Sequence, residues 1–281
     1  MSRAIEMHRL EDLTHFEQLR VETAGFIQNV LRSTTKETSG HQMAFHELML
    51  LAYKEGCIAL ILGKTEEHIR ECYRQAADYG IKMLGIAEGQ DGLRSFEVDL
   101  EGNDQGLTHV QIRPRPVREG ERKLSIDKFI TALDMITAFG ASTAIKVVAE
   151  FPEDSYTANP NVIADASTLA DLRARRAWLR GDAETARRDG RAALSKNTNE
   201  RVKPAMAAFL SIVDGEETAF AAALMDVVKA HKKFYQKYPH VAEGAVCFPG
   251  MSLCRMALDR GFPVDEQPYL PIRFLPNYRA A

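Results

Sequence analysis

The chain has 281 residues, a length that suits one helical domain or two fused helical lobes. Hydrophobic residues make up 45% of it and charged residues 27%, ordinary globular values that argue against disorder. The net charge of -3 provides no basic field of the kind that draws proteins to phosphate backbones or anionic lipid. We therefore expect no direct binding of nucleic acid and no association with a membrane.

The cysteines and the N-terminus indicate a reducing, cytosolic compartment. The chain turns polar and acidic directly after Met1, unlike a signal peptide, and its most apolar stretch, Leu48 to Leu62, is too short to span a bilayer. The thiols form no CxxC pair and lie in apolar stretches, which is typical of small buried side chains in the cytosol. They are Cys57, Cys72, Cys247 and Cys254.

Residues 1–88 show helical periodicity. The pattern predicts helices over Leu10 to Arg32, Gln42 to Leu62 and Glu66 to Ile86. In the second of these, apolar residues occupy nearly every side, as expected of a central helix surrounded by others. Gly63 then ends that helix and Thr65 caps the next one.

Between residues 89 and 120 the pattern changes. Phe96, Val98 and Leu100 alternate with polar residues, and the segment Gly102 to Gly106 supplies a turn before Val110, so we expect a β-hairpin. The prolines at 114 and 116 then impose extended backbone. This is the most natural internal boundary, and it divides the chain into 1–88, 89–120 and 121–281 within one continuous domain.

Helices resume after residue 120. Ser125 caps a helix that we expect to continue to Glu150, followed by a polar loop from Pro152 to Pro160. The predicted fold class is all-α, with about nine helices in stacked hairpins and one small mid-chain β-hairpin. The remaining predicted helices cover Val162 to Leu179, Ala183 to Leu194, Glu200 to Val213, Glu216 to Lys237 and Phe248 to Arg260.

Two turns of this part resemble each other. Gly181 and Gly215 lie 34 positions apart, the period of a tetratricopeptide repeat, and each is followed by an alanine-rich helix. A third turn, at Gly63, lies too far upstream for a continuous array. Partly tetratricopeptide-like hairpins and ordinary helix-turn-helix packing both remain open.

The chain shows no catalytic, cofactor or metal motif. Gly63-Lys64-Thr65 is similar to the end of a phosphate-binding loop, but Ile58 stands where its first glycine belongs. His41 and His46 are five apart, whereas a zinc helix needs a spacing of four, and Ser252 lacks the second glycine of a nucleophile elbow. We therefore predict no catalytic residue, no cofactor and no metal.

A basic stretch from Arg173 to Arg191 is a candidate for anion binding. Acidic residues such as Asp171, Asp182 and Asp189 are interspersed with the arginines, which is typical of salt-bridged helix faces in solvent. The stretch also lacks the interleaved aromatic residues that would stack on bases. We expect solvent-exposed arginines and no nucleic-acid site.

Residues from Glu217 to Pro271 contain a phenylalanine-bearing helix that ends in a His-Lys-x-x-Tyr segment, then Gly-Phe-Pro, then Tyr-Leu-Pro. In this combination of motifs, the last third of the chain resembles the immunity protein 49 family of bacterial polymorphic toxin systems. A Gln-Pro pair precedes the last motif where the family favours a Ser-Asp-like pair. The matching residues are His231, Lys232, Tyr235, Gly261, Phe262, Pro263, Tyr269, Leu270 and Pro271. They are of structural types: Gly261 stops a helix, and Tyr269 and Leu270 are expected to pack back on the bundle.

The resemblance implies a helical protein that is not an enzyme and that neutralises a cognate toxin by stoichiometric binding. It leaves the toxin's chemistry open; a nuclease or a nucleic-acid deaminase with a cationic cleft would favour an acidic inhibitor surface. A helical adaptor that organises a complex is the alternative function, and an enzyme of unrecognised type is the third. The oligomeric state is not predicted.

The expected toxin contacts lie in two of the longer connections. Loops can carry specificity on a constant scaffold, and tyrosine and carboxylate side chains are frequent contact residues. Solvated loop charges are the alternative interpretation of the same residues. The predicted contacts are Glu153, Asp154 and Tyr156 in the first connection and Asp265 and Glu266 near the C-terminus.

Overall fold

The computed structural model describes residues 13–35, 41–88, 96–103, 106–114, 124–157, 165–197, 199 and 202–278. These are mostly helical, which confirms the predicted helical character. Their contacts divide the chain into two compact units. The N-terminal unit comprises Leu13–Ala132 with Phe151–Val162, and the C-terminal unit comprises Leu133–Glu150 with Ile163–Ala281.

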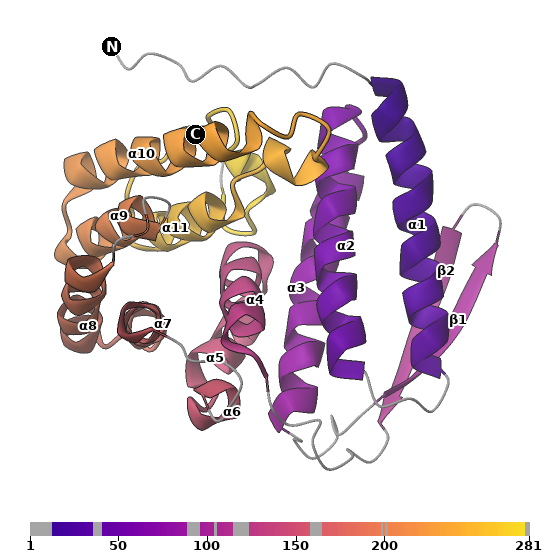
Figure 1. Cartoon of the computed structure of the whole chain (residues 1–281), viewed down its shortest axis with the longest axis horizontal. Helices are drawn as coiled ribbons and strands as arrows, with labels where there is room; N and C mark the ends of the chain where they lie inside the picture. The colour runs from indigo at the N-terminus through magenta and orange to yellow at the C-terminus, as the bar shows by residue number, and fades with distance from the viewer. Residues whose placement is uncertain are drawn as a thin grey trace. The chain divides into compact units, whose positions relative to one another are not determined.

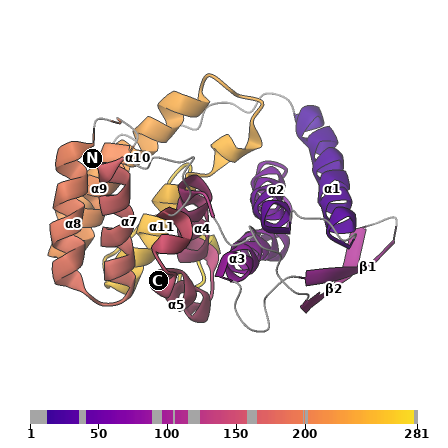
Figure 2. The same ribbon diagram turned by 60° about the horizontal axis from the view of Figure 1, so that its bottom comes forward.

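Three long helices form most of the N-terminal unit: α1 (Leu13–Thr35), α2 (His41–Ile61) and α3 (Glu66–Glu88). Helix α2 packs against both others and lies between them (Figures 1 and 2). Its Phe45, Leu48 and Ile58 side chains are fully buried, as expected of a central helix. Met43 and Leu50 nevertheless stay 48% and 40% exposed, so one face of α2 is left open.

The approach of α2 to α3 depends on a glycine. A Cβ atom placed on Gly56 would lie 2.5 Å from Cε1 of Tyr73, whose side chain is fully buried on α3. Only a residue without a side chain fits there at this interhelical distance.

Two strands follow α3 in the chain, β1 (Phe96–Asn103) and β2 (Gly106–Pro114), and they pair antiparallel. Leu100 lies opposite Val110, and the register shifts between Glu101 and Gly102. Helix α1 contacts β1 (Figure 2). The predicted separator at 36–40 and connector at 115–120 lie outside the described residues.

Helix α4 (Ile126–Phe139) begins in the N-terminal unit, directly after the predicted cap Ser125. Its Phe129 ring stacks on Tyr156 in the short helix α6 (Asp154–Thr157), with ring centroids 4.2 Å apart. The backbone N–H of Leu124 also donates to the carbonyl of Ser155 at 3.0 Å. These contacts hold α6 against the start of α4.

The sequence-based prediction of one helix from Ser125 to Glu150 was wrong. Helix α4 ends at Phe139, and α5 (Ser142–Glu150) begins two residues after Gly140. A Cβ atom on Gly140 would lie 2.6 Å from the carbonyl oxygen of Ile136, so the chain turns sharply there. Apolar spacing continues through this turn, and it therefore hid the break.

Helices build the rest of the C-terminal unit. Helix α7 packs on α5 and α8, and α9 packs on α8, α10 and α11 (Figure 2). The elements are α7 (Ala166–Leu179), α8 (Ala183–Lys196), α9 (Val202–Asp214), α10 (Glu217–Tyr235) and α11 (Phe248–Asp259), with two short 3-10 helices, η1 (Ala242–Ala245) and η2 (Ile272–Phe274).

Four helices end in the same way, at a glycine with positive φ. Gly181 has φ 84° and Gly215 has φ 83°, and the residue after each donates its N–H to a carbonyl five positions upstream. Gly63 and Gly261 repeat this arrangement, which is the Schellman motif that satisfies the last carbonyls of a helix. The predicted stops at Gly63 and Gly261 are confirmed.

The expectation that the Arg173 to Arg191 arginines all face solvent was wrong for two of them. Arg176 is buried and donates from Nε to the carbonyl of Ala149 at the end of α5, at 3.1 Å. Arg175 bridges Asp134 on α4 and Asp171 on α7, and all three side chains are at most 11% exposed. The interspersed acidic residues correctly predicted ion pairs, but the network of Arg175 with its two aspartates lies in the interior.

The cysteines are all free and buried, as predicted from their apolar surroundings. Among the helices of the described residues, none combines the length and the apolar character needed to cross a membrane.

Candidate functional site

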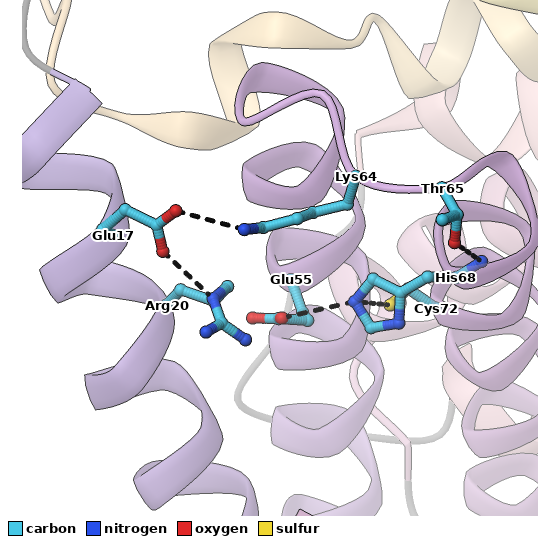
Figure 3. Close-up of polar contacts among 7 residues, drawn as sticks. All are labelled: Glu17, Arg20, Glu55, Lys64, Thr65, His68 and Cys72. Carbon is cyan, nitrogen blue, oxygen red and sulfur yellow. Dashed lines mark hydrogen bonds and ion pairs between the residues drawn. The ribbon is translucent and has the colours of Figure 1, made fainter. Parts of the chain in front are cut away.

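Polar side chains from α1, α2, α3 and the α2–α3 turn meet in the N-terminal unit (Figure 3). Lys64 donates to Glu17 at 3.1 Å and Arg20 donates to the same carboxylate at 3.4 Å. Behind them, Nε2 of His68 lies 3.7 Å from Oε1 of Glu55, which is largely buried. Burial raises the pKa of Glu55, although nearby His68 lowers it in part, and its Oε2 atom has no hydrogen-bond partner. The cluster fastens the three helices to one another.

The cluster also contains Cys72, but the geometry does not favour nucleophilic catalysis. Burial raises the pKa of the Cys72 thiol to about 12, so the reactive thiolate is not populated near neutral pH. Its Sγ atom lies 3.8 Å from Nε2 of His68, the same nitrogen that Glu55 approaches. A catalytic His needs one nitrogen for the nucleophile and the other for an orienting acid. The arrangement therefore does not supply an activated cysteine.

The segment that resembles a phosphate-binding loop belongs to this cluster. Thr65 caps α3 as predicted, since its Oγ1 accepts from the backbone N–H of His68 at 3.4 Å. Lys64 points to Glu17 on α1, where a carboxylate neutralises it. Sequence reasoning assigned the roles of Gly63 and Thr65 correctly but missed the polar cluster, because its members come from separate helices. The spacing of four between His68 and Cys72 was its one local signal.

The first predicted contact loop, around Glu153, offers less surface than expected. Tyr156 is 1% exposed and its ring is stacked against Phe129 and Phe151, so it presents no contact area in this conformation. Glu153 is half-buried, and the side chain of Asp154 lies outside the described ones. Among the described side chains of this loop, Glu153 is therefore the one predicted contact that remains partly accessible.

The second predicted contact loop, Asp265 to Glu266, is open to solvent. Both residues are exposed, and Glu266 forms an ion pair with Arg273. The loop closes through a pair of hydrogen bonds between Gln267 and Leu270, the shorter at 2.9 Å. Tyr269 adopts φ 69°, a conformation that is rare for residues other than glycine. Asp265 and Glu266 thus directly precede a hydrogen-bonded turn at Gln267 to Leu270.

The residues that carry the family resemblance pack under this loop. His231 is buried, and its Nε2 lies 3.0 Å from the carbonyl oxygen of Gly244. Its ring contacts Tyr235 at 4.7 Å and Tyr269 at 5.4 Å between centroids. Tyr269 and Leu270 are 1% and 0% exposed, which confirms that they pack back on the bundle. These motifs shape the turn that presents the acidic loop.

Comparison with known families gives one match. The family model described as immunity protein 49 matches residues 94–274. The chain belongs to the immunity protein 49 family. Neither the curated proteins nor the solved structures contain a match to it.

Membership of the immunity protein 49 family implies an immunity protein of a toxin system. The matched region begins just before β1 and ends with the last residue of η2. It includes both predicted contact loops, whereas α1, α2, α3 and the polar cluster of Figure 3 precede it. Among the described residues, no three His, Cys, Asp or Glu side chains are placed together to hold a metal ion.

Proposed function

We propose that this chain is the cytosolic immunity protein of a toxin–immunity pair and that it neutralises its cognate toxin by stoichiometric binding, without turnover. The observation that carries the proposal is the match of the immunity protein 49 family model to residues 94–274.

The exposed acidic loop supports a toxin with a cationic surface. Asp265 has no ion-pair partner among the described residues, and the whole chain carries a net charge of -3. A nuclease or a nucleic-acid deaminase binds an anionic substrate, so a carboxylate-bearing inhibitor complements its cleft and speeds encounter. We infer an association rate that falls as salt concentration rises; a rate that salt leaves unchanged would exclude electrostatic steering.

Co-expression tests the proposal. The product of the gene adjacent to the one that encodes this chain is induced in a bacterial host with and without the chain. Growth should be rescued, and the two proteins should copurify in a fixed ratio. A control that co-expresses an unrelated helical protein excludes a general effect of expression load. A neighbouring product that stays lethal and unbound contradicts the proposal.

Charge reversal tests the two predicted loops separately. One variant combines Glu153→Lys with Asp154→Lys, and the other combines Asp265→Lys with Glu266→Lys. Reversal at a central contact should weaken toxin binding by about 2 kcal/mol, or about thirtyfold. Because the second variant also breaks the Glu266–Arg273 ion pair, Asp265→Lys alone is the cleaner measurement. Parent-like affinity in both variants would place the interface elsewhere.

One structural observation favours the second candidate function, a helical adaptor. Helices α7, α8, α9 and α10 pack in sequence, and the α7–α8 and α9–α10 turns have the same Schellman geometry. The resemblance of this array to tetratricopeptide repeats stays a proposal. An adaptor would bind a protein other than the adjacent gene product, so affinity purification from the native host separates the two functions.

A further inference from the structure

The chain's one tryptophan lies on the surface of the C-terminal unit. Trp178 is near the end of α7 and is half-buried. The guanidinium carbon of Arg260, at the end of α11, lies 5.4 Å from the centre of its ring. Arg260 is exposed and forms no ion pair among the described residues. A cation over an indole face is attracted by the ring's quadrupole, so each side chain restricts the other.

The same arginine touches a third helix end. A Cβ atom placed on Gly215, in the α9–α10 turn, would lie 3.1 Å from Nη2 of Arg260. The guanidinium of Arg260 therefore lies against the α9–α10 turn as well as over Trp178. The ends of α7, α9 and α11 meet at this side chain, and they are far apart in the sequence. We call Trp178, Gly215 and Arg260 the Trp178 edge.

Carboxylates follow both glycine turns at the ends of α7 and α9. Asp182 follows Gly181 in the α7–α8 turn, and Glu216 and Glu217 follow Gly215; all three are exposed and form no ion pair among the described residues. Asp214 differs, because Arg187 neutralises it at 2.5 Å. The edge thus combines an aromatic–arginine centre with exposed carboxylates that form no ion pair among the described residues, which we call its acidic rim. Asp182 also caps α8, because its side chain accepts from the backbone N–H of Thr185 at 3.0 Å; this hydrogen bond, with smaller contributions from Arg180 and Arg188, lowers the pKa of Asp182.

This combination is typical of a binding surface. Tryptophan and arginine are enriched among the residues that dominate protein interfaces, where they fill pockets at the centre of the contact. A stacked pair loses little conformational freedom on binding, since its rotamers are already restricted.

We propose that the Trp178 edge is the toxin-binding surface, with the Trp178 ring entering an apolar pocket of the toxin and basic toxin residues facing Asp182, Glu216 and Glu217. This rests on the proposed function. The occupant is the cognate toxin because the family model that matches this segment is that of an immunity protein. The exposed carboxylates would complement basic residues on a toxin that acts on an anionic substrate. The edge lies within the segment that the family model matches.

Because the chain has one tryptophan, a single probe reports on the edge. The full chain is labelled with 5-fluorotryptophan, which gives one fluorine resonance, and is titrated with an unlabelled, catalytically inactivated product of the adjacent toxin gene. On binding, the resonance should move and lose its sensitivity to exchange of H₂O for D₂O, as the ring leaves water. Affinity is measured in parallel on the unlabelled chain.

Variants test the same contact by affinity. Trp178→Ala and Arg260→Ala should each weaken binding by about tenfold or more, and Glu216→Lys combined with Glu217→Lys by about thirtyfold. Tyr238→Ala, which removes an aromatic ring that is 44% exposed beyond the other end of α10, should bind like the parent. Circular dichroism checks the fold of every variant. If Trp178→Ala misfolds, Arg260→Ala and the fluorine signal decide.

The Glu216→Lys and Glu217→Lys double variant has a matched control. Glu66→Lys with Glu67→Lys reverses two exposed carboxylates in the first turn of α3, so its helix-dipole cost is similar to that at α10. If the Glu66/Glu67 reversal weakens toxin binding as much as the Glu216/Glu217 reversal does, the change in net charge alone explains the loss. That result would overturn the role of the acidic rim in binding. Tight toxin binding with an unmoved fluorine resonance and unaffected variants would overturn the Trp178 edge while leaving the proposed function standing. No toxin binding by the parent would overturn both.

Discussion

The buried ion triad of Asp134, Arg175 and Asp171 provides a quantitative test of what holds the C-terminal unit together. Arg175 donates from Nη1 to Asp134 at 2.7 Å and from Nη2 to Asp171 at 2.8 Å. Replacing it by Arg175→Met keeps much of the apolar stem but leaves two carboxylates buried without their cation. The substitution therefore isolates the charge from the packing.

The expected loss follows from these contacts. Each hydrogen bond to a charged group contributes about 1.5–3 kcal/mol, and removing one partner of a buried ion pair costs about 3–5 kcal/mol. Two atoms of the triad, Nε of Arg175 and Oδ1 of Asp171, have no hydrogen-bond partner, so the network is incompletely satisfied. We therefore expect Arg175→Met to lower the free energy of unfolding by about 3 kcal/mol, the lower end of that range.

Urea unfolding followed by circular dichroism measures the loss, and its pH dependence tests the cause. Burial raises the pKa of Asp134 and of Asp171, while Arg175 opposes that rise. Without the cation, the pKa values of both aspartates rise further above their values in the unfolded chain. The folded Arg175→Met variant therefore binds more protons than its unfolded chain over a wider range of pH than the parent does. The folded variant gains stability as its carboxyls protonate. Its deficit should shrink as the pH falls from neutral toward the ordinary aspartate value of 3.8.

Two further variants serve as controls for the Arg175→Met prediction. Arg188→Met removes an exposed arginine that pairs with Asp189 at 2.8 Å and should leave the free energy of unfolding nearly unchanged. The triple change Asp134→Leu, Asp171→Leu and Arg175→Met removes all three charges and should recover most of the lost stability. If Arg175→Met unfolds like Arg188→Met, the buried triad does not stabilise this unit and the reasoning is refuted.

Three further predictions concern stability. Gly56→Ala should destabilise the chain by about 1–3 kcal/mol, since the added methyl group meets a buried aromatic ring. Gly25→Ala, whose Cβ would meet nothing within 4 Å, should instead stabilise it by up to about 1 kcal/mol. The midpoints of urea unfolding compare the two variants. Gly181→Ala should cost about 1–2 kcal/mol for its positive φ, and Gly215→Ala should cost more because it also displaces an arginine; a smaller loss at Gly215 would contradict this. Burial lowers the pKa of His46 to about 4, so the unfolded chain takes up the proton first and stability should fall as the pH drops from 6.5 toward 4. His46→Gln should reduce that slope, and an unchanged slope would exclude His46 as its source.

The sequence was sufficient to predict a helix boundary where residues at that boundary determine it. The predicted start at Glu66 and the stop at Gly63 depend on a cap and a left-handed glycine, and both are local to the chain. The break at Gly140 was missed because apolar spacing continues through it. The close contact with the Ile136 carbonyl that defines it exists only once the chain has turned.

The candidate contact residues show the limit of reasoning from loops. Tyr156 lies in a polar connection, which favours an exposed ring, yet it stacks on Phe129, 27 positions upstream. Asp265 is exposed, as expected of a loop carboxylate on which no distant ring packs. The exposure of a loop residue therefore could not be predicted where a residue distant in the sequence packs on it.

The Trp178 edge illustrates the same limit at the level of a surface. The 34-residue spacing of Gly181 and Gly215 predicts two equivalent turns, and their φ values and hydrogen bonds are nearly the same. Their surroundings differ, since a Cβ atom would meet nothing at Gly181 but would meet the Arg260 guanidinium at Gly215. A residue from α11 therefore makes one of two similar turns chemically distinct. A repeat pattern alone cannot locate a partner surface in this chain, because the side chain that completes it comes from outside the repeat.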